Sequence, residues 1–526
     1  MFFLKETRER TITLVLVVIL VAIVSGIFSY SLKKPIPPGV DSETYINDAN
    51  WILDNEKIPA PKQALYNHLK AYVTFEIDIL IVVLKQFTGL NIVFPLFSLF
   101  QLFLIVFLCL TTYLVGSVFS RTIGVISIAF IAINYGYFRL FNGSSVSNLL
   151  AFSLLNLFFY FLYQWHVSVK KVSYFILLVI TIGSLFFTHR YLTAPILLFS
   201  IPLYAIIIFA SHKKAREYFF VGAKHILNSK TLTASIFFLA TITLFILINY
   251  LSPIVVETLN SFFGVESESK FQKVITFGLY PDYIGPLLLI MGILGVIVFL
   301  LSQYQNKIHK IFPLFWTVIL LGIFPNVHYF GITFYYERLI FLGSTFLALF
   351  AAILVDFLYH RFIHLVRSPA TLILVSSFLT VLIVSAGVRM NVDLANRSNY
   401  VEEGHIEAFN ILRSLTLKDE TVISNTSRVS QTSHDRIISD RNIKNYSFAS
   451  TQDASLIFFN PDDEATIEYL KNNGIRFIVL QKPSLEGEKL LQQSEELFFA
   501  SQSFESVYHS ADVSIFKLRT LLDEDT

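Results

Sequence analysis

The chain has 526 residues, of which 54% are hydrophobic, and a formal net charge of +2. Its mean hydropathy of +0.62 is too high for a water-soluble globule of this length, so a bilayer is the better solvent. The charge is uneven, because residues 391–526 carry 22 Asp and Glu against 13 Lys and Arg. This acidic balance disfavours a nucleic-acid partner and indicates that the chain changes solvent near residue 390.

Eleven stretches before residue 390 approach the ~20 apolar residues that cross the hydrocarbon core as a helix. They are residues 11–30, 91–116, 122–138, 146–165, 172–188, 192–210, 232–252, 283–301, 311–325, 338–358 and 371–389. Helix ends are uncertain by a few residues, so about ten to thirteen crossings fit the pattern. The segment 71–88 contains Glu76, Asp78 and Lys85, which predicts an interfacial helix along the membrane surface.

Basic residues predict the orientation, because Lys and Arg in short loops resist translocation. If the amino terminus is cytoplasmic, every loop on its side carries basic residues: Arg121; Lys170 and Lys171; Lys213, Lys214, Arg216, Lys224 and Lys230; Lys307 and Lys310; Arg361 and Arg367. An odd number of crossings then places the tail outside. We therefore expect a multi-pass protein of the cell membrane with a cytoplasmic amino terminus.

The tail, residues 391–526, is predicted to be a small extracytoplasmic α/β domain that follows a transmembrane domain, residues 1–390, with a first outside loop at 32–90. The expected strands are Thr421 to Ser424, Ser455 to Phe459, Ile475 to Leu480 and Val513 to Leu518. The expected helices are Ile406 to Leu415, Glu464 to Asn472 and Glu488 to Phe499. Acceptor docking and a folded cap without a catalytic part are both open as its task.

Carboxylates gather in the first outside loop, residues 39–59, which reads GVDSETYINDANWILDNEKIP. Asp41, Glu43 and Asp48 are placed at the membrane surface, where they can meet both a lipid headgroup and a soluble acceptor. A carboxylate there can take the proton from an attacking hydroxyl. The alternative for Asp41 is a solvated loop acid or a helix cap.

This loop resembles the first loop of the GT-C superfamily of polyprenyl-phosphate-sugar-dependent glycosyltransferases, which includes protein O-mannosyltransferases and the aminoarabinose transferase of lipid A. Those enzymes carry an acid, then Tyr four residues later, Ala four further on and an Ile-Pro-like turn. The matching residues are Asp41, Tyr45, Ala49, Ile58 and Pro59.

Two looser patterns extend the resemblance. Gly116, Phe119, Arg121 and Gly124 are spaced as in the first cytoplasmic turn of such enzymes. The run Tyr335, Tyr336, Glu337 and Arg338 is similar to their donor-side segment at the mouth of a late helix.

The resemblance implies an integral membrane glycosyltransferase that transfers one sugar from a polyprenyl-phosphate donor to an extracytoplasmic protein, lipid or glycan, with inversion. Asp41 and Glu43 are the catalytic candidates. The candidates for binding the donor phosphate and substrate are Arg338, Glu337, Tyr335, His189, Arg190 and Tyr45.

Plainer interpretations of the cations stay open. His189 and Arg190 stand between two predicted crossings joined by almost no loop, where a headgroup anchor competes with a cavity-facing role. Arg338 opposes the macrodipole at the start of a helix, which favours an anionic partner, yet an ion pair with Glu337 or snorkelling also accounts for it.

Departures from the family pattern bear on cofactors and acceptor. Ser42 separates the two loop acids, and Asn142 and Asn148 stand where relatives often carry Asp. Both departures weigh against a bound divalent metal, since a hard cation prefers several carboxylate oxygens; no other cofactor is indicated. The chain has no Trp-Trp-Asp signature, which argues against transfer of a preassembled glycan to Asn.

Two rival functions remain. An O-antigen-type polysaccharide polymerase or ligase would use the same lipid-phosphate chemistry and give oligomeric products. A flippase or transporter should place charges deep in several helices and show internal repeats, whereas the charges here cluster at the ends of the predicted helices.

Overall fold

The computed structural model describes the chain in several separate ranges. These are residues 2–29, 76–90, 95–142, 145–196, 200–211, 277–302, 307–326, 336–365, 421–425, 442–445, 457–481, 488–511 and 513–519, with short pieces at 45, 49, 52–53, 56, 385, 387–388, 407–408, 411–412 and 414–416. The chain divides into two compact units. One contains Met1–Ile27, Leu104–Phe138 and Ser147–Met390, and the other contains Phe28–Phe103, Arg139–Val146 and Asn391–Thr526.

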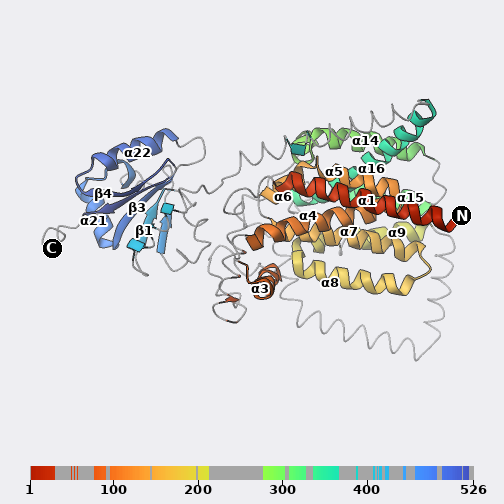
Figure 1. Cartoon of the computed structure of the whole chain (residues 1–526), viewed down its shortest axis with the longest axis horizontal. Helices are drawn as coiled ribbons and strands as arrows, with labels where there is room; N and C mark the ends of the chain where they lie inside the picture. The colour runs from red at the N-terminus through yellow and green to blue at the C-terminus, as the bar shows by residue number, and fades with distance from the viewer. Residues whose placement is uncertain are drawn as a thin grey trace. The chain divides into compact units, whose positions relative to one another are not determined.

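Helices dominate the described part before residue 390 (Figure 1). They are α1 Phe2–Ser29, α3 Glu76–Thr88, α4 Phe97–Ser117, α5 Arg121–Ile131, α6 Tyr135–Asn142, α7 Val146–Val167, α8 Lys171–Pro195, α9 Ile201–Ser211, the 3-10 turn η5 Phe277–Leu279, α13 Tyr280–Ile284, α14 Pro286–Leu301, α15 Lys307–Thr317, the π-helix η6 Val318–Ile323 and α16 Tyr336–Leu365.

Four helical stretches in the described ranges are long and apolar enough to cross a membrane, or five if the bent pair α5 and α6 is counted as one span. The four are Arg10–Ser29, Phe97–Ser117, Val146–Val167 and Arg338–Arg361. The multi-pass architecture is therefore confirmed. The number eleven stays a prediction, since stretch 232–252 and most of 371–389 lie outside the described residues.

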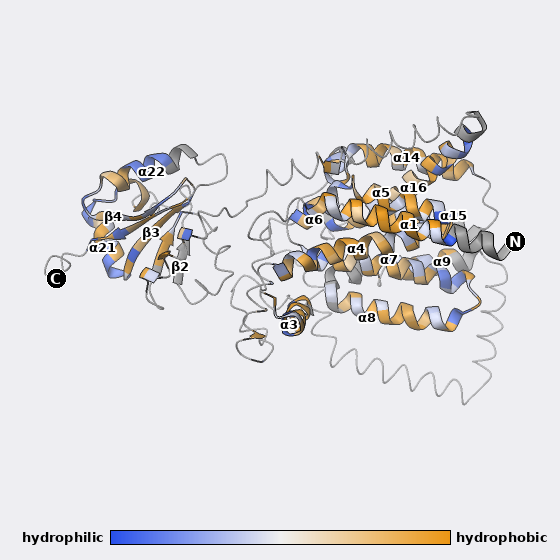
Figure 2. Ribbon diagram, in the orientation of Figure 1, coloured by the Kyte–Doolittle hydropathy of each residue, from blue (hydrophilic) through white to orange (hydrophobic). Residues whose placement is uncertain are grey.

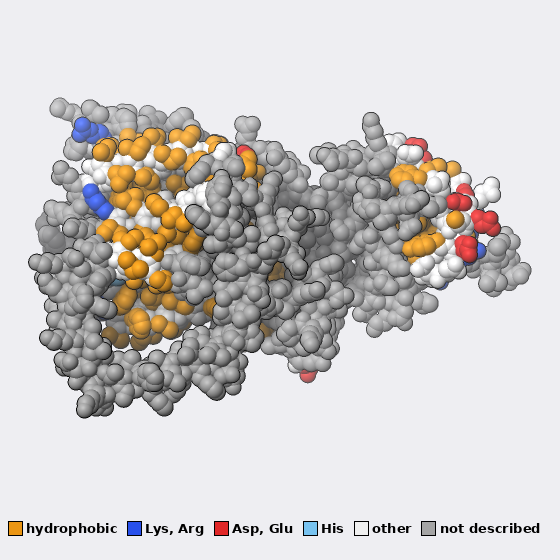
Figure 3. Space-filling model, turned by 180° about the vertical axis from the view of Figure 1, so that it is seen from behind, with side chains coloured by type: hydrophobic (Ala, Val, Ile, Leu, Met, Phe, Trp, Pro, Cys, Tyr) orange, Lys and Arg blue, Asp and Glu red, His pale blue; other side chains and the backbone are white. Residues whose placement is uncertain are grey.

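The outer surfaces of these helices are apolar (Figure 2). Val18 on α1 is 59% exposed, Phe103 on α4 58% and Ile290 on α14 58%. Figure 3 shows such side chains covering one face of the bundle, with the visible Lys and Arg side chains at one end of it. Exposed apolar area on this scale matches contact with lipid tails, since water would disfavour it.

The expected crossing 122–138 is not one straight helix. It divides into α5 and α6, whose axes differ by 53°. Asn134 stands at the break and accepts a hydrogen bond from the Tyr137 amide at the start of α6 (3.4 Å). The sequence prediction missed this bend because it rested on mean hydropathy, which stays high across the segment, although Asn134 and Gly136 are residues that favour turns.

Two other boundaries differ from expectation. Helix α8 continues through His189 and Arg190 to Pro195, so neither residue lies in a loop. The expected crossing 283–301 begins with a separate turn, α13, because Gly285 adopts φ 97°, a conformation that suits glycine.

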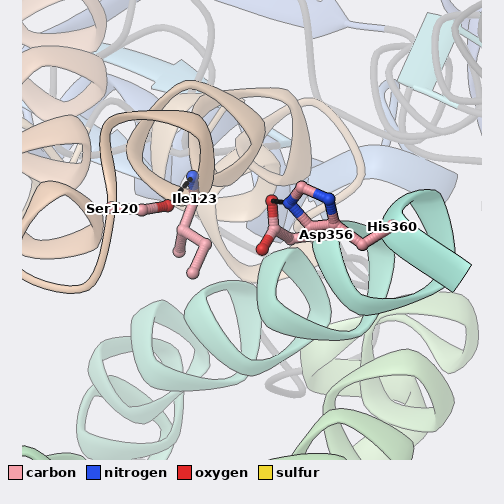
Figure 4. A network of polar contacts seen from close by, with 4 residues as sticks. All are labelled: Ser120, Ile123, Asp356 and His360. Carbon is pink, nitrogen blue, oxygen red and sulfur yellow. Dashed lines mark hydrogen bonds and ion pairs between the residues drawn. The ribbon is translucent and has the colours of Figure 1, made fainter. Parts of the chain in front are cut away.

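The turn between α4 and α5 depends on two glycines. A Cβ on Gly116 would lie 2.8 Å from the Gly124 Cα atom, so the two backbones approach closely. Ser120 caps α5 by accepting a hydrogen bond from the Ile123 amide (3.0 Å), as Figure 4 shows. This turn contains the Gly116 to Gly124 spacing noted in the sequence.

The C-terminal part forms a five-stranded sheet of order β2-β1-β3-β5-β4. The strands are β1 Thr421–Ser424, β2 Asn442–Asn445, β3 Ile475–Gln481, β4 Phe504–His509 and β5 Val513–Leu518. Strand β1 pairs in parallel with β2 and β3, while β5 pairs antiparallel with β3 and β4. Helices α21 Glu464–Asn472 and α22 Glu488–Ala500 accompany it.

Each face of the sheet buries its own apolar cluster. Ile478, Leu480 and Phe516 pack with Leu470 of α21 and Phe498 of α22. On the opposite face, Val422, Phe477, Val479 and Ile515 pack with Ala408 and Leu412. This alternation is what a sheet covered on both faces requires.

The predicted elements of the tail are largely confirmed, namely β1, β3, β5, α21 and α22. The expected strand Ser455 to Phe459 is wrong, because residues 457–459 are helical. Strands β2 and β4 were missed. Both are edge strands, which pair on one side only and so lack the apolar alternation that predicts a buried strand.

Candidate functional site

Three described residues of the first loop lie on one buried helical face. Tyr45, Ala49 and Ile52 are helical and follow the i, i+4, i+7 spacing of a single face. Their exposed fractions are 9%, 0% and 8%. The Tyr45 ring stacks on Phe97 at the start of α4, with centroids 6.5 Å apart. The tyrosine of the family pattern thus packs against the start of α4, and its role on the donor side stays a prediction.

Buried polar side chains occur in the same compact unit as this loop. Gln101 on α4 donates a hydrogen bond to the Phe141 carbonyl on α6 (3.3 Å), and Phe28 of α1 packs edge-on against the Phe141 ring. The end of α1, the start of α4 and the end of α6 therefore meet. Asn142 is 4% exposed.

Helix α3 adds an acid that sequence reasoning placed differently. The helix is present at Glu76–Thr88, but Asp78 is fully buried together with Ile77 and Ile81. The charge at position 78 therefore does not lie on an exposed face of α3, whereas the interfacial position of this helix stays a prediction. The sequence did carry a signal for this burial, because Asp78 is flanked by the β-branched residues Ile77 and Ile79 within an apolar run.

Helix α16 begins at the Tyr-Glu-Arg segment, and its position is fixed by polar pairs. Ser344 accepts a hydrogen bond from Asn134 Nδ2 (2.6 Å), and Thr345 Oγ1 lies 2.5 Å from the Tyr137 hydroxyl. Close packing of Gly136 on Phe341 adds to these bonds. The break between α5 and α6 therefore holds the helix that carries Arg338, whose side chain is partly buried.

No protein-family model and no curated protein matches the sequence. Solved structures do match. The oligosaccharyltransferase AglB from Archaeoglobus fulgidus, in complex with an inhibitory peptide and a dolichol-phosphate, aligns at TM-score 0.56 and 12% identity over 98% of this chain and 75% of its own.

Two further structures align over nearly the whole chain. ArnT from Cupriavidus metallidurans bound to undecaprenyl phosphate aligns at TM-score 0.55 and 10% identity, over 95% of this chain and 97% of its own. The arabinofuranosyltransferase AftD from Mycobacteria gives TM-score 0.55 and 12% identity over 96% of this chain and 41% of its own. All three are GT-C membrane glycosyltransferases.

This chain has the GT-C fold. The resemblance first seen in one loop is thereby confirmed at the level of fold, along almost the full length of the chain.

The proposed site residues fall into three groups. Asp41, Glu43 and Tyr335 lie outside the described residues. Glu337, His189 and Arg190 are placed in helices α16 and α8 by their backbone alone. Tyr45 and Arg338 are described with their side chains. That the residues of all three groups converge around one substrate stays a prediction.

Within the described ranges, no group of three or more His, Cys, Asp or Glu side chains is arranged to hold a metal ion. The two loop acids are outside those ranges, so a metal at the first loop stays untested.

The opposite end of α16 carries a different polar pair. Asp356 Oδ1 and His360 Nε2 lie 3.7 Å apart, one helical turn from each other (Figure 4). Helix α5 packs along α16. Figure 4 shows the Ser120 cap at the start of α5 in the same view as the Asp356 and His360 pair on α16. The spacing of four residues puts both side chains on one face of α16, where such pairs contribute a few tenths of a kcal/mol to helix stability.

Proposed function

We propose that this protein is an integral membrane glycosyltransferase that transfers a single sugar from a polyprenyl-phosphate carrier to an extracytoplasmic acceptor, with inversion at the anomeric carbon. The observation that supports this most is the reciprocal fold match to ArnT, which covers 95% of this chain and 97% of ArnT, solved with undecaprenyl phosphate. AglB, which aligns over 98% of this chain, is likewise solved with a lipid phosphate, dolichol-phosphate.

Asp41 is the proposed base or acceptor-orienting acid. It precedes Tyr45 by the same four residues that separate Tyr45 from Ala49, which is the spacing of the acid, Tyr and Ala in the family pattern. A carboxylate fixed there can take the acceptor proton as charge develops at the anomeric carbon. Glu43 is the second candidate for this role.

Arg338 is the proposed partner of the donor phosphate, since a guanidinium pairs with two phosphate oxygens at once. It stands at the start of α16, which the Asn134 and Tyr137 bonds hold in place. Tyr335, Glu337, His189, Arg190 and Tyr45 are supporting candidates for the donor side. The missing Trp-Trp-Asp signature favours transfer of one sugar over transfer of a whole glycan.

The test is transfer from a labelled polyprenyl-phosphate sugar by the purified protein, with products read by mass spectrometry. Asp41→Asn should lower the rate by about 10²- to 10⁴-fold, the usual contribution of a general base. Its matched control, Asp48→Asn in the same loop, should stay near wild type.

Arg338→Ala should weaken use of the donor by about tenfold or more, whereas Arg361→Ala, at the other end of the same helix, should not. Full activity in correctly folded Asp41→Asn and Arg338→Ala proteins would refute these roles. A ladder of products would favour the polymerase or ligase, and donor translocation without transfer would favour the flippase.

A further inference from the structure

The C-terminal sheet changes its direction of winding between β1 and β3. After β1 the chain continues to β2, which lies on the outer side of β1. After β3 it passes through α22 to β4, beyond β5 on the other side of the sheet. The connections that follow two neighbouring parallel strands thus depart in opposite directions. In open α/β sheets, ligands bind at the carboxyl ends of the strands at such a point.

Three polar side chains meet at this edge: Ser424, Asn425 and Gln481. They are 0%, 3% and 0% exposed, next to the apolar Val422 and Val479. The Asn425 side chain binds only the backbone of Gln481, accepting from its amide (2.7 Å) and donating to its carbonyl (2.8 Å). Asn425 therefore fixes the ends of β1 and β3, and the Gln481 side chain is not needed for that.

Only one of the two polar atoms of the Gln481 side-chain amide forms a hydrogen bond within the described part of the chain. Its Nε2 donates to Ser424 Oγ (2.9 Å), but its buried Oε1 has no hydrogen-bond partner among the residues that the structure describes. If the amide were reversed, Ser424 would donate to Oε1 and the nitrogen would be the group left over. A buried polar atom without a partner costs about 1–3 kcal/mol, and an apolar residue of similar size would avoid this cost.

The chemistry of the edge selects a class of ligand. Two amides and one hydroxyl carry no formal charge, so they offer no ion pair to a phosphate, a carboxylate or a metal ion. A sugar hydroxyl can donate to the Gln481 oxygen and accept from a neighbouring donor with the same atom. We propose that the carboxyl edge between β1 and β3 binds a neutral carbohydrate through the Gln481 side chain. The proposal does not depend on transfer activity.

The test is saturation-transfer NMR on the full-length protein in nanodiscs, with maltose, lactose and mannobiose as neutral probes and sialyllactose and a tripeptide as comparisons. At least one neutral sugar should bind. Gln481→Met should weaken it about tenfold, the effect of losing one hydrogen bond to an otherwise unpaired group. The matched control is Gln492→Met on α22, whose side chain is exposed and binds Glu496. It should bind like wild type.

Asp41→Asn should also bind like wild type, which separates this site from the proposed transfer site. Because Met removes an unpaired buried atom, Gln481→Met should unfold no earlier than wild type. If it proves unstable, hydrogen exchange of the wild-type protein decides instead. The bound sugar should then slow exchange of the Asn425 and Gln481 amides. The proposal would be overturned if no neutral sugar bound, or if the protein preferred the peptide or the acidic sugar. It would also be overturned if a folded Gln481→Met protein bound the sugar as wild type does, or if the sugar left the exchange of these amides unchanged.

Discussion

Polar side chains inside the helical bundle are arranged in pairs that join distant segments. Asn156 on α7 donates to Thr112 on α4 (3.1 Å), and Asn134 and Tyr137 bond Ser344 and Thr345 on α16. Such bonds satisfy groups that hydrocarbon cannot. They help to specify which helix faces touch, because these donor and acceptor atoms meet only when the helices pack in this arrangement.

Replacing Tyr137 by Phe tests this at a single atom. The variant loses the hydroxyl contact with Thr345 and should be destabilised by about 0.6 kcal/mol, and by no more than about 2 kcal/mol, the range for hydrogen bonds between membrane helices. Thermal unfolding in detergent measures the change. Tyr135→Phe, at a partly buried neighbour, should unfold like wild type. Equal unfolding temperatures for the two variants would show that the pair contributes nothing to stability.

At the scale of elements, close approach between helices depends on small residues. Helix α14 packs along α16. A Cβ on Gly295 would lie 2.0 Å from the Phe350 carbonyl oxygen, and one on Gly292 would lie 2.8 Å from a Leu347 methyl carbon. The first neighbour is backbone and cannot rotate away. This contact uses the small-residue packing that is common between membrane helices.

Gly295→Ala should therefore force α14 away from α16 and cost about 1–3 kcal/mol, as overpacking does. Gly183→Ala on α8 is the matched control, since a Cβ there meets nothing within 4 Å. That variant should be neutral or gain up to about 1 kcal/mol from the better helix propensity of Ala. Unfolding in a denaturant series compares the two. A Gly295→Ala protein as stable as wild type would contradict the tight contact.

For the whole molecule, orientation in the membrane is predicted from the basic loops alone. The GT-C fold is compatible with it but does not determine which end faces the cytoplasm. The chain allows a direct measurement, because Cys109 is its single cysteine and is fully buried.

In a Cys109→Ser background, Ala511→Cys places a thiol in the exposed turn between β4 and β5, and Val169→Cys places one at a 99% exposed position beside Lys170. A membrane-impermeant maleimide should label the first in right-side-out vesicles and the second in inside-out vesicles. The reverse pattern would invert the topology, and labelling of both from one side would rule out an extracytoplasmic tail.

The sequence by itself determined the features that depend on local composition. Apolar stretches predicted helices α1, α4, α7 and α16, because the free energy of transfer to lipid adds up along a segment. Alternating apolar residues likewise predicted β1, β3 and β5. In the first loop, the spacing of Tyr45 and Ala49 indicated the fold before any helix was placed.

Only the tertiary structure decided the features that depend on contacts between distant residues. The bend between α5 and α6 is held by Asn134 and Ser344, 210 positions apart, and hydropathy cannot encode such a pair. Edge strands β2 and β4 are strands because neighbours pair with them, and Asp78 is buried by its surroundings despite its charge. Local preference names the elements, whereas burial and pairing are properties of the assembled chain.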